Sequence, residues 1–155
     1  MTYALNFNRF WETTKPVAFL GGEIPARFVS EKDDQEPTPR QIAALDSVNA
    51  LTEAVMPALV DLARRDFQTR LAAWGITADE LEVEIDEDHL QNHFVINSIL
   101  IPRLGDCQIN YVFLAGECDW DMEHGIEFLL KDGWPIRCEA QAGLALNAAW
   151  SNYLT

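Results

Sequence analysis

The stretch from Ile109 to Arg137 constrains the fold more than any other part of the chain. Two apolar runs, Ile109 to Ala115 and Ile126 to Leu130, flank a polar corner at Glu117 to Gly125. Asp132-Gly133 follows, and this dipeptide favours a tight turn. Because β-rich runs joined by glycine-bearing loops are typical of hairpins, the stretch predicts antiparallel strands.

The first of these runs is apolar on both faces, with Tyr111 and Phe113 on one side and Val112 and Leu114 on the other. A strand of this kind usually lies in the middle of a sheet beneath a covering layer. We therefore expect it to pair with the β-rich segment at 94–102, and we expect helices to cover the sheet.

Residues 39–74 would supply those helices. Thr38 is a good N-cap, Pro39 suits the first helical position, and Gly75 suits a helix end. Apolar residues recur between them at helical steps of three and four, and Pro57 predicts a break or kink. The apolar stripe consists of Ile42, Leu45, Val48, Thr52, Val55, Leu59, Ala63, Phe67, Leu71 and Trp74.

The order of these segments predicts a single α+β domain, in which a mainly antiparallel sheet packs against a central pair of helices or one kinked helix. We expect an N-terminal β-hairpin at about 16–30 across Gly21-Gly22, helices at about 39–74, antiparallel strands at about 93–138 and a terminal helix at about 139–150. Residues 80–86 carry conflicting helix and strand patterns, which we interpret as a helical turn followed by a strand-like segment.

Charge limits the classes of partner. The chain has 25 acidic and 11 basic residues, for a net charge of −14. Such a surface repels phosphate backbones and anionic membranes, so it disfavours nucleic-acid and membrane partners and suits a basic protein. Three cysteines without CxxC spacing, and no signal-peptide pattern, predict a cytoplasmic protein. We expect no cofactor, and the sequence does not predict an oligomeric state.

Acidic side chains are concentrated between Asp79 and Asp88, where seven acids occur without a base. In the strand-like interpretation Glu82, Glu84 and Asp86 point outward, where a basic protein would bind. The plainer alternative is a solvated edge.

The helical region also carries a basic cluster on the face opposite the apolar stripe. We expect a solvated face with ion pairs between neighbouring turns, in preference to an anion site. The cluster consists of Asp61, Arg64, Arg65, Asp66 and Arg70.

Carboxylates occupy alternate positions of the polar corner. Because hard cations take oxygen ligands, Asp119, Asp121 and Glu123 are candidate ligands for calcium or magnesium. The calcium-hand pattern is not met, so we favour a structural polar corner. His89 and His93 stand four residues apart, which is a weak indication of a metal site.

Glu123 and His124 are candidates for a general acid–base pair, since a carboxylate can orient an imidazole. We favour the alternative that His124 braces the turn ahead of Gly125. Cys118 has acidic neighbours that suppress its thiolate, so we expect a structural cysteine instead of a nucleophile. Trp120 either plugs the end of the sheet or stands exposed as an anchor for a partner.

Two stretches, Pro37 to Leu45 and Glu117 to Gly125, together resemble a group of small uncharacterised bacterial domains with a C-terminal Cys-x-Trp-Asp-x-Glu-His-Gly motif. The motif falls on Cys118, Trp120, Asp121, Glu123, His124 and Gly125. That group has no assigned reaction, so the resemblance implies the fold and the importance of the corner. By analogy with other small acidic bacterial domains, it also suggests an immunity-type role, in which the protein neutralises a cognate toxin.

The sequence thus favours a non-enzymatic cytoplasmic protein-binding module that uses Glu82, Glu84, Asp86 and Trp120 to bind a basic protein. The alternative is a metal-dependent or acid–base enzyme centred on Asp121, Glu123 and His124. A third interpretation is a purely structural corner on a domain whose interface lies elsewhere.

Overall fold

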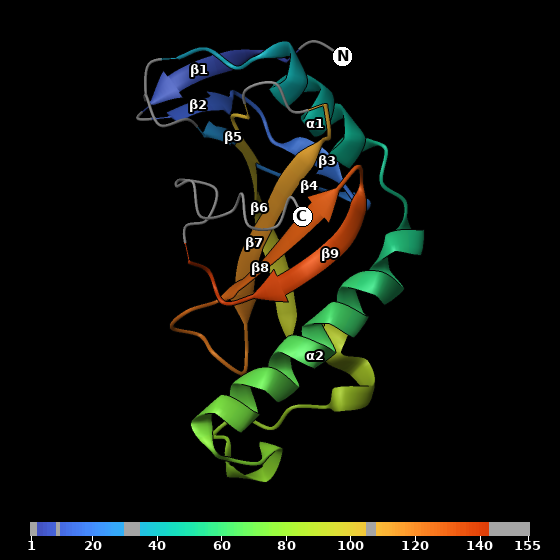
Figure 1. Ribbon diagram of the computed structural model, residues 1–155, viewed down its shortest axis with the longest axis vertical. Coiled ribbons are helices and arrows are strands. Elements are labelled where there is room, and N and C mark those ends of the chain that lie inside the picture. The colour runs from blue at the N-terminus through green and yellow to red at the C-terminus, as the bar shows by residue number, and fades with distance from the viewer. Residues whose placement is uncertain (1–2, 9, 30–34, 105–107, 143–155) are drawn as a thin grey trace.

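A seven-stranded sheet forms the centre of the protein (Figure 1). The computed structural model describes residues 3–8, 10–29, 35–104 and 108–142. The strands lie in the order β1 (Leu5–Asn8), β2 (Phe10–Thr13), β5 (Ala26–Val29), β6 (Phe94–Pro102), β7 (Tyr111–Cys118), β8 (Ile126–Lys131) and β9 (Trp134–Glu139). Among the strands of the described residues, only β5 and β6 pair in parallel. The predicted α+β class with a mainly antiparallel sheet is therefore confirmed.

β7 lies in the interior of the sheet, between β6 and β8, as the two-sided apolar pattern predicts. Every residue from Tyr111 to Gly116 is buried. Val112 and Leu114 belong to the main core on the helical side, whereas Tyr111 and Phe113 belong to a smaller core on the opposite face. Each face of this strand therefore contributes to a separate apolar cluster.

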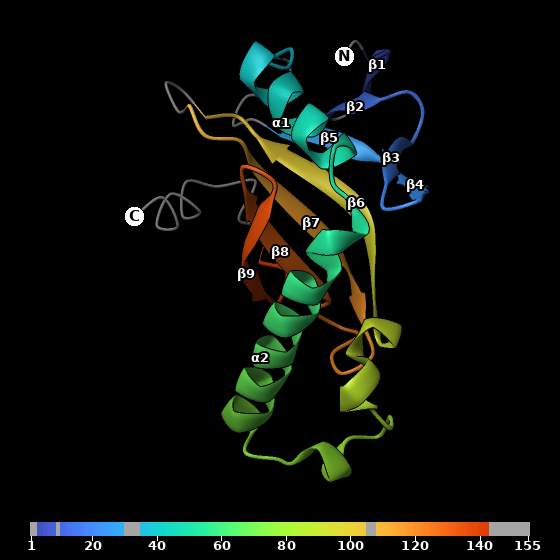
Figure 2. The same ribbon diagram turned by 90° about the vertical axis from the view of Figure 1, so that its right-hand side faces the viewer.

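Two helices cover one face of the sheet (Figure 2). α1 (Pro39–Asn49) begins with a capping box, in which Thr38 accepts from the Gln41 backbone and Gln41 accepts from the Thr38 backbone. A 3-10 turn, η1 (Glu53–Val55), precedes α2 (Met56–Trp74), which ends at Gly75 with a left-handed φ of 69°.

The break between the helices lies earlier than predicted, at residues 50–52, and Pro57 sits in the first turn of α2. A proline is tolerated there because the first N–H groups of a helix have no partner within the helix. No single helix in the described ranges is long and apolar enough to cross a membrane; the helical segments Pro39–Asn49 and Glu53–Trp74 meet that test only together, across an 89° bend.

The N-terminal strands are more numerous than predicted. β3 (Val17–Phe19) and β4 (Gly22–Ile24) form the hairpin expected around the Gly-Gly pair, as a separate two-stranded sheet. Pro25 then ends the hairpin, because it lacks a backbone donor, and β5 enters the large sheet instead. β1 and β2, which the sequence pattern did not reveal, add a second hairpin at the edge of that sheet.

The segment between α2 and β6 contains no strand. η2 (Ala78–Glu80) is the predicted helical turn, and η3 (Glu87–Asn92) leads into β6. The strand-like interpretation of residues 81–86 is wrong: they form an irregular loop in which Leu81 and Ile85 pack on the main core and Val83 is exposed. The alternation of apolar and acidic residues in this segment reflects the packing of Leu81 and Ile85 on the core, and no described strand pairs with the segment. The terminal helix predicted at 139–150 lies largely outside the described residues; Glu139 ends β9, and residues 140–142 are not helical.

Candidate functional site

The polar corner is a tight loop between β7 and β8. Gly125 N donates to Asp121 O at 2.9 Å, and Asp119 N donates to His93 O at 2.8 Å. Gly125 has a φ of +66°, and a Cβ there would also lie 2.8 Å from Gln141 Nε2. The loop therefore requires glycine at this position for both its conformation and its packing.

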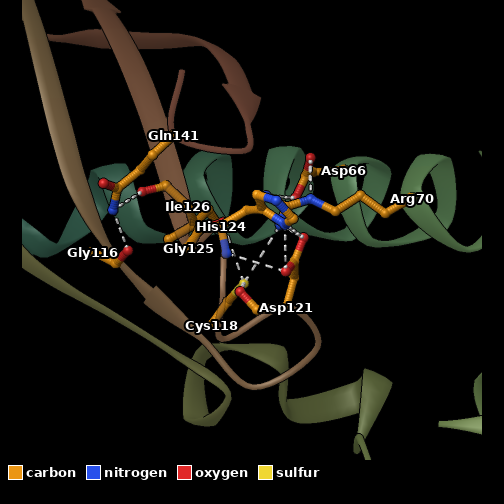
Figure 3. A network of polar contacts seen from close by, with 9 residues as sticks. All are labelled: Asp66, Arg70, Gly116, Cys118, Asp121, His124, Gly125, Ile126 and Gln141. Carbon is orange, nitrogen blue, oxygen red and sulfur yellow. Dashed lines mark hydrogen bonds and ion pairs between the residues drawn. The ribbon is translucent and has the colours of Figure 1, made fainter. Parts of the chain in front are cut away.

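Arg70 of α2 reaches into this corner and joins it to the helix (Figure 3). Its Nε lies 3.1 Å from Asp66 Oδ1 and its Nη2 lies 2.8 Å from Asp66 Oδ2, while Nη1 lies 3.0 Å from Asp121 Oδ2. The other Asp121 oxygen accepts from the backbone N–H of His124 at 3.2 Å and from His124 Nδ1 at 3.0 Å. We call these four residues, Asp66, Arg70, Asp121 and His124, the Arg70 network.

The network favours the charged forms of its central pair. Burial acts to raise the pKa of Asp121, but the hydrogen bonds from His124 and the charge of Arg70 outweigh it, so the pKa lies below its usual range. Burial acts to lower the pKa of Arg70, but Asp66 and Asp121 keep it above its usual value. An ion pair with both side chains about 9% exposed therefore links α2 to the corner.

The prediction that Asp66 and Arg70 lie on a solvated helix face is wrong. They are 7% and 8% exposed, and they lie beside the stripe residues Phe67 and Leu71. Of the predicted basic cluster, only Asp61, Arg64 and Arg65 form exposed or half-exposed ion pairs on the surface. The i, i+4 spacing of Asp66 and Arg70 is compatible with an exposed ion pair and with a buried one. Their partner Asp121 is distant in the sequence, so the spacing alone could not indicate burial.

Cys118 packs beneath the loop. Its thiol lies 3.6 Å from the carbonyl oxygens of Asp121 and Gly125, and Arg70 Nη1 lies 3.9 Å from Sγ. Burial raises the pKa of the thiol to about 11. The thiol is therefore protonated at neutral pH, which suits a structural role and not a nucleophile.

Trp120 is 4% exposed, so it is not the exposed anchor that the binding hypothesis uses. Its ring packs edge-on against Phe67 of α2 at 5.5 Å and against Phe94 of β6 at 6.4 Å between centroids. The tryptophan thus plugs the space between the helix and the end of the sheet.

The candidate metal ligands point to different partners. Asp119 pairs with His93, Asp121 pairs with Arg70 and His124, and Glu123 is exposed. His89 pairs with Asp86. Within the described ranges, no three His, Cys, Asp or Glu side chains are grouped so that they could hold a metal ion. The same geometry places the His124 ring beside Asp121, three residues back, where its Nδ1 lies 3.0 Å from Asp121 Oδ1.

His93 joins the corner to the acidic loop at 81–86. Asp86 N donates to His93 Nε2 at 2.9 Å, and His93 Nδ1 lies 2.9 Å from Asp119 Oδ2. Since Nε2 accepts the first bond, Nδ1 carries the proton that is donated to Asp119. One imidazole therefore holds together two acidic segments that are about 30 residues apart in the sequence.

A hollow of about 400 Å³ opens beside His93. Val95 and Met122, which are 54% and 75% exposed, line it together with Glu117 and Asp119. Glu82, Glu84 and Asp86 are exposed on the neighbouring loop. We call these seven residues the acidic face: Glu82, Glu84, Asp86, Val95, Glu117, Asp119 and Met122.

A protein-family model described as a domain of unknown function, DUF6985, matches residues 2–146 of the chain. The chain belongs to this family. Comparison with curated proteins finds no match, and neither does comparison with solved structures. The expectation of an uncharacterised domain is confirmed, while the bacterial grouping and its motif stay predictions.

Sequence reasoning missed two features of this DUF6985 domain: the Arg70 network and the exposed apolar pair on the acidic face. An Asp and an Arg one turn apart, directly beside a buried stripe, are the only pattern that could have indicated the network. Val95 and Met122 gave no such indication, because nothing in their neighbourhood distinguishes an exposed apolar side chain from a buried one.

Proposed function

We propose that this member of the DUF6985 family is a non-enzymatic cytoplasmic protein-binding module, and that its acidic face binds a basic protein in the manner of an immunity protein that neutralises a cognate toxin. The single observation that carries the proposal is the link through His93. It holds the acidic loop at 81–86 against the corner, next to the hollow in which Glu117 and Asp119 lie beside the exposed side chains of Val95 and Met122.

This composition suits a protein interface. Exposed apolar groups rimmed by polar residues are typical of binding sites, and among the described residues no lysine or arginine lines the hollow. A net charge of −14 would accelerate the approach of a basic partner through long-range attraction. The Arg70 network supports the proposal indirectly, because it fixes the loop that carries Asp119 and Met122.

Association kinetics test the proposal. A partner is first captured from a lysate of the native cells, identified, and produced separately. Reversal of Glu82 and Glu84 to Lys should then slow association with that partner at least about tenfold, because it replaces attraction with repulsion. Asp86 is kept, since its carboxylate accepts from the Asp88 backbone and thereby caps η3.

The matched control reverses Glu12 and Glu36, which changes the net charge equally but lies outside the acidic face. Association of this variant should change far less, and that of the native protein should slow as salt is added. Equal effects of the two variants, or a basic partner whose association ignores salt, would contradict the proposal.

The Asp121–His124 contact favours a second candidate function, an acid–base enzyme. A carboxylate on Nδ1 orients the imidazole and leaves Nε2 of a ring that is 59% exposed available for proton transfer. Three results together would support this candidate over the binding module. The native protein would turn over a small substrate, His124→Gln would lose that turnover, and neither protein would bind a basic protein.

A further inference from the structure

The N-terminal half of β6 forms an open edge of the sheet. β5 pairs with β6 only from Ile99 to Pro102, and β4 pairs with β3. On the side of β6 that faces these strands, residues Phe94 to Ser98 therefore pair with no strand within the described part of the chain, although β4 lies close to β6. An unpaired strand edge of this kind is a template for another extended chain.

A groove of about 650 Å³ runs beside this edge. The β3–β4 hairpin and the start of α2 form its other walls, and its lining is mainly apolar, with Phe19, Ile24, Met56 and Val95 among its residues. In a strand added to this edge, every second side chain would face the protein and would contact the apolar lining of the groove.

The charge of the groove indicates the kind of segment that would occupy it. Of the described residues that line it, Glu23 and Glu53 are charged, and both are exposed acids. Basic side chains on the outward positions of an added strand would lie near these carboxylates, whereas acidic ones would be repelled.

We propose that the basic partner inserts an extended segment, with alternating apolar and basic residues, into this groove as an additional strand on the open edge of β6. This rests on the proposed function for the identity of the partner, but the groove can be tested separately. Val95 lines both the groove and the hollow of the acidic face, so the two sites are contiguous.

The probe is the synthetic peptide KVKIKVK, titrated into the full-length protein. The comparison peptide KPKGKPK carries the same charge, but its prolines lack the backbone donors that a ladder needs. We expect saturable binding of the first peptide, at least about tenfold tighter than that of the second, since main-chain pairing contributes to affinity in strand addition. Backbone amides in the segment 94–98 should exchange with solvent more slowly when KVKIKVK is bound. Equal binding of the two peptides, or unchanged exchange in that segment, would overturn the proposal.

Reversal of Glu23 and Glu53 to Lys should weaken binding of KVKIKVK at least about fivefold. The control reverses Glu36 and Asp79, which changes the net charge equally away from the groove, and binding should fall much less. Circular dichroism and thermal melting confirm that each variant is folded. Equal losses of affinity in the two variants would show that peptide binding depends on net charge alone, and would overturn the proposal that the peptide binds in the groove.

The two proposals fail in different ways. If the natural partner is sensitive to reversal of Glu82 and Glu84 but not to reversal of Glu23 and Glu53, the acidic face stands and the groove is overturned. If KVKIKVK binds at β6 as described but no basic protein associates with the chain, the strand-adding groove stands and the proposed function is overturned.

Discussion

Arg70 Nη1 lies 3.0 Å from Asp121 Oδ2, and this contact joins the C-terminal part of α2 to the loop between β7 and β8. The two residues are 51 positions apart in the sequence. Asp66 occupies the other side of the guanidinium, so the arginine is held between a carboxylate of its own helix and one of the loop. This buried cation therefore fixes the position of the corner relative to the helix together with the packing of Trp120 on Phe67.

The first prediction concerns this contact. Asp121→Ala should lower the free energy of unfolding by about 2–3 kcal/mol, because it leaves one side of a buried guanidinium unpaired and removes an acceptor for the His124 backbone. His124→Ala should cost less than about 1 kcal/mol, since the ring is 59% exposed. Urea unfolding measures both values.

A double-mutant cycle provides the control. Arg70→Met and Asp121→Asn remove the two partners separately and together, and the loss in the double variant should be smaller than the sum of the single losses. Additive losses would show that the two side chains do not stabilise each other.

The second prediction concerns Glu127, which is 3% exposed and lies opposite Glu139 on β9. Burial, and then the charge of Glu139, raises its pKa to about 7. An acid whose pKa is higher in the folded protein contributes stability that is fully present below its unfolded pKa and is lost as the pH rises through the folded value. The free energy of unfolding should therefore fall by about 2 kcal/mol between pH 5 and pH 8 on account of this group.

Glu127→Gln tests that assignment. The variant should be more stable than the native protein at pH 8, and its stability should vary less between pH 5 and pH 8, as measured by urea unfolding across the range. Asp121 acts at lower pH, because its pKa is depressed and its contribution is lost only as the pH falls. Identical pH profiles of the native protein and Glu127→Gln would contradict the prediction.

The third prediction concerns Gly116, where β7 passes the irregular register between Ile96 and Ser98 of β6. A Cβ at this position would overlap the carbonyl oxygen of Val95 and lie 2.9 Å from Ile96 Cα. Since backbone atoms cannot move aside as a flexible side chain can, Gly116→Ala should cost about 3 kcal/mol or more. Gly22→Ala is the control, because its Cβ would meet nothing closer than 3.6 Å; similar melting temperatures of the two variants would contradict the clash.

How much of this could be predicted from the sequence depends on the range of the interactions. The four C-terminal strands and the start of α1 follow from local patterns: the two-sided apolar run around Val112, the Asp132-Gly133 turn, and Thr38 followed by Pro39. These features are encoded by neighbouring residues, so periodicity and capping chemistry reveal them.

The sequence-based predictions are wrong where contacts between distant parts of the chain determine the local structure or the burial of a side chain. The alternation of Leu81 to Asp86 is that of a strand, but a strand needs a neighbour, and the chain places this segment beyond the end of the sheet, where His93 holds it. The charges of Asp66 and Arg70 fit a solvated helix face equally well, until a carboxylate from the corner makes burial of the arginine favourable. In both cases the deciding partner is distant in the sequence.

The last prediction separates the two prominent apolar residues of the corner, Trp120 and Met122. Trp120→Ala should lower the free energy of unfolding by about 3–5 kcal/mol, because it leaves a cavity between Phe67 and Phe94. Met122 is 75% exposed, so Met122→Ala should change stability by less than about 0.5 kcal/mol. If the acidic face binds a partner, the same substitution should instead speed dissociation of the complex, since an exposed apolar side chain becomes buried there. Urea unfolding and dissociation kinetics measured on both variants would test the distinction, and a Met122→Ala complex that dissociates at the native rate would remove the methionine from the interface.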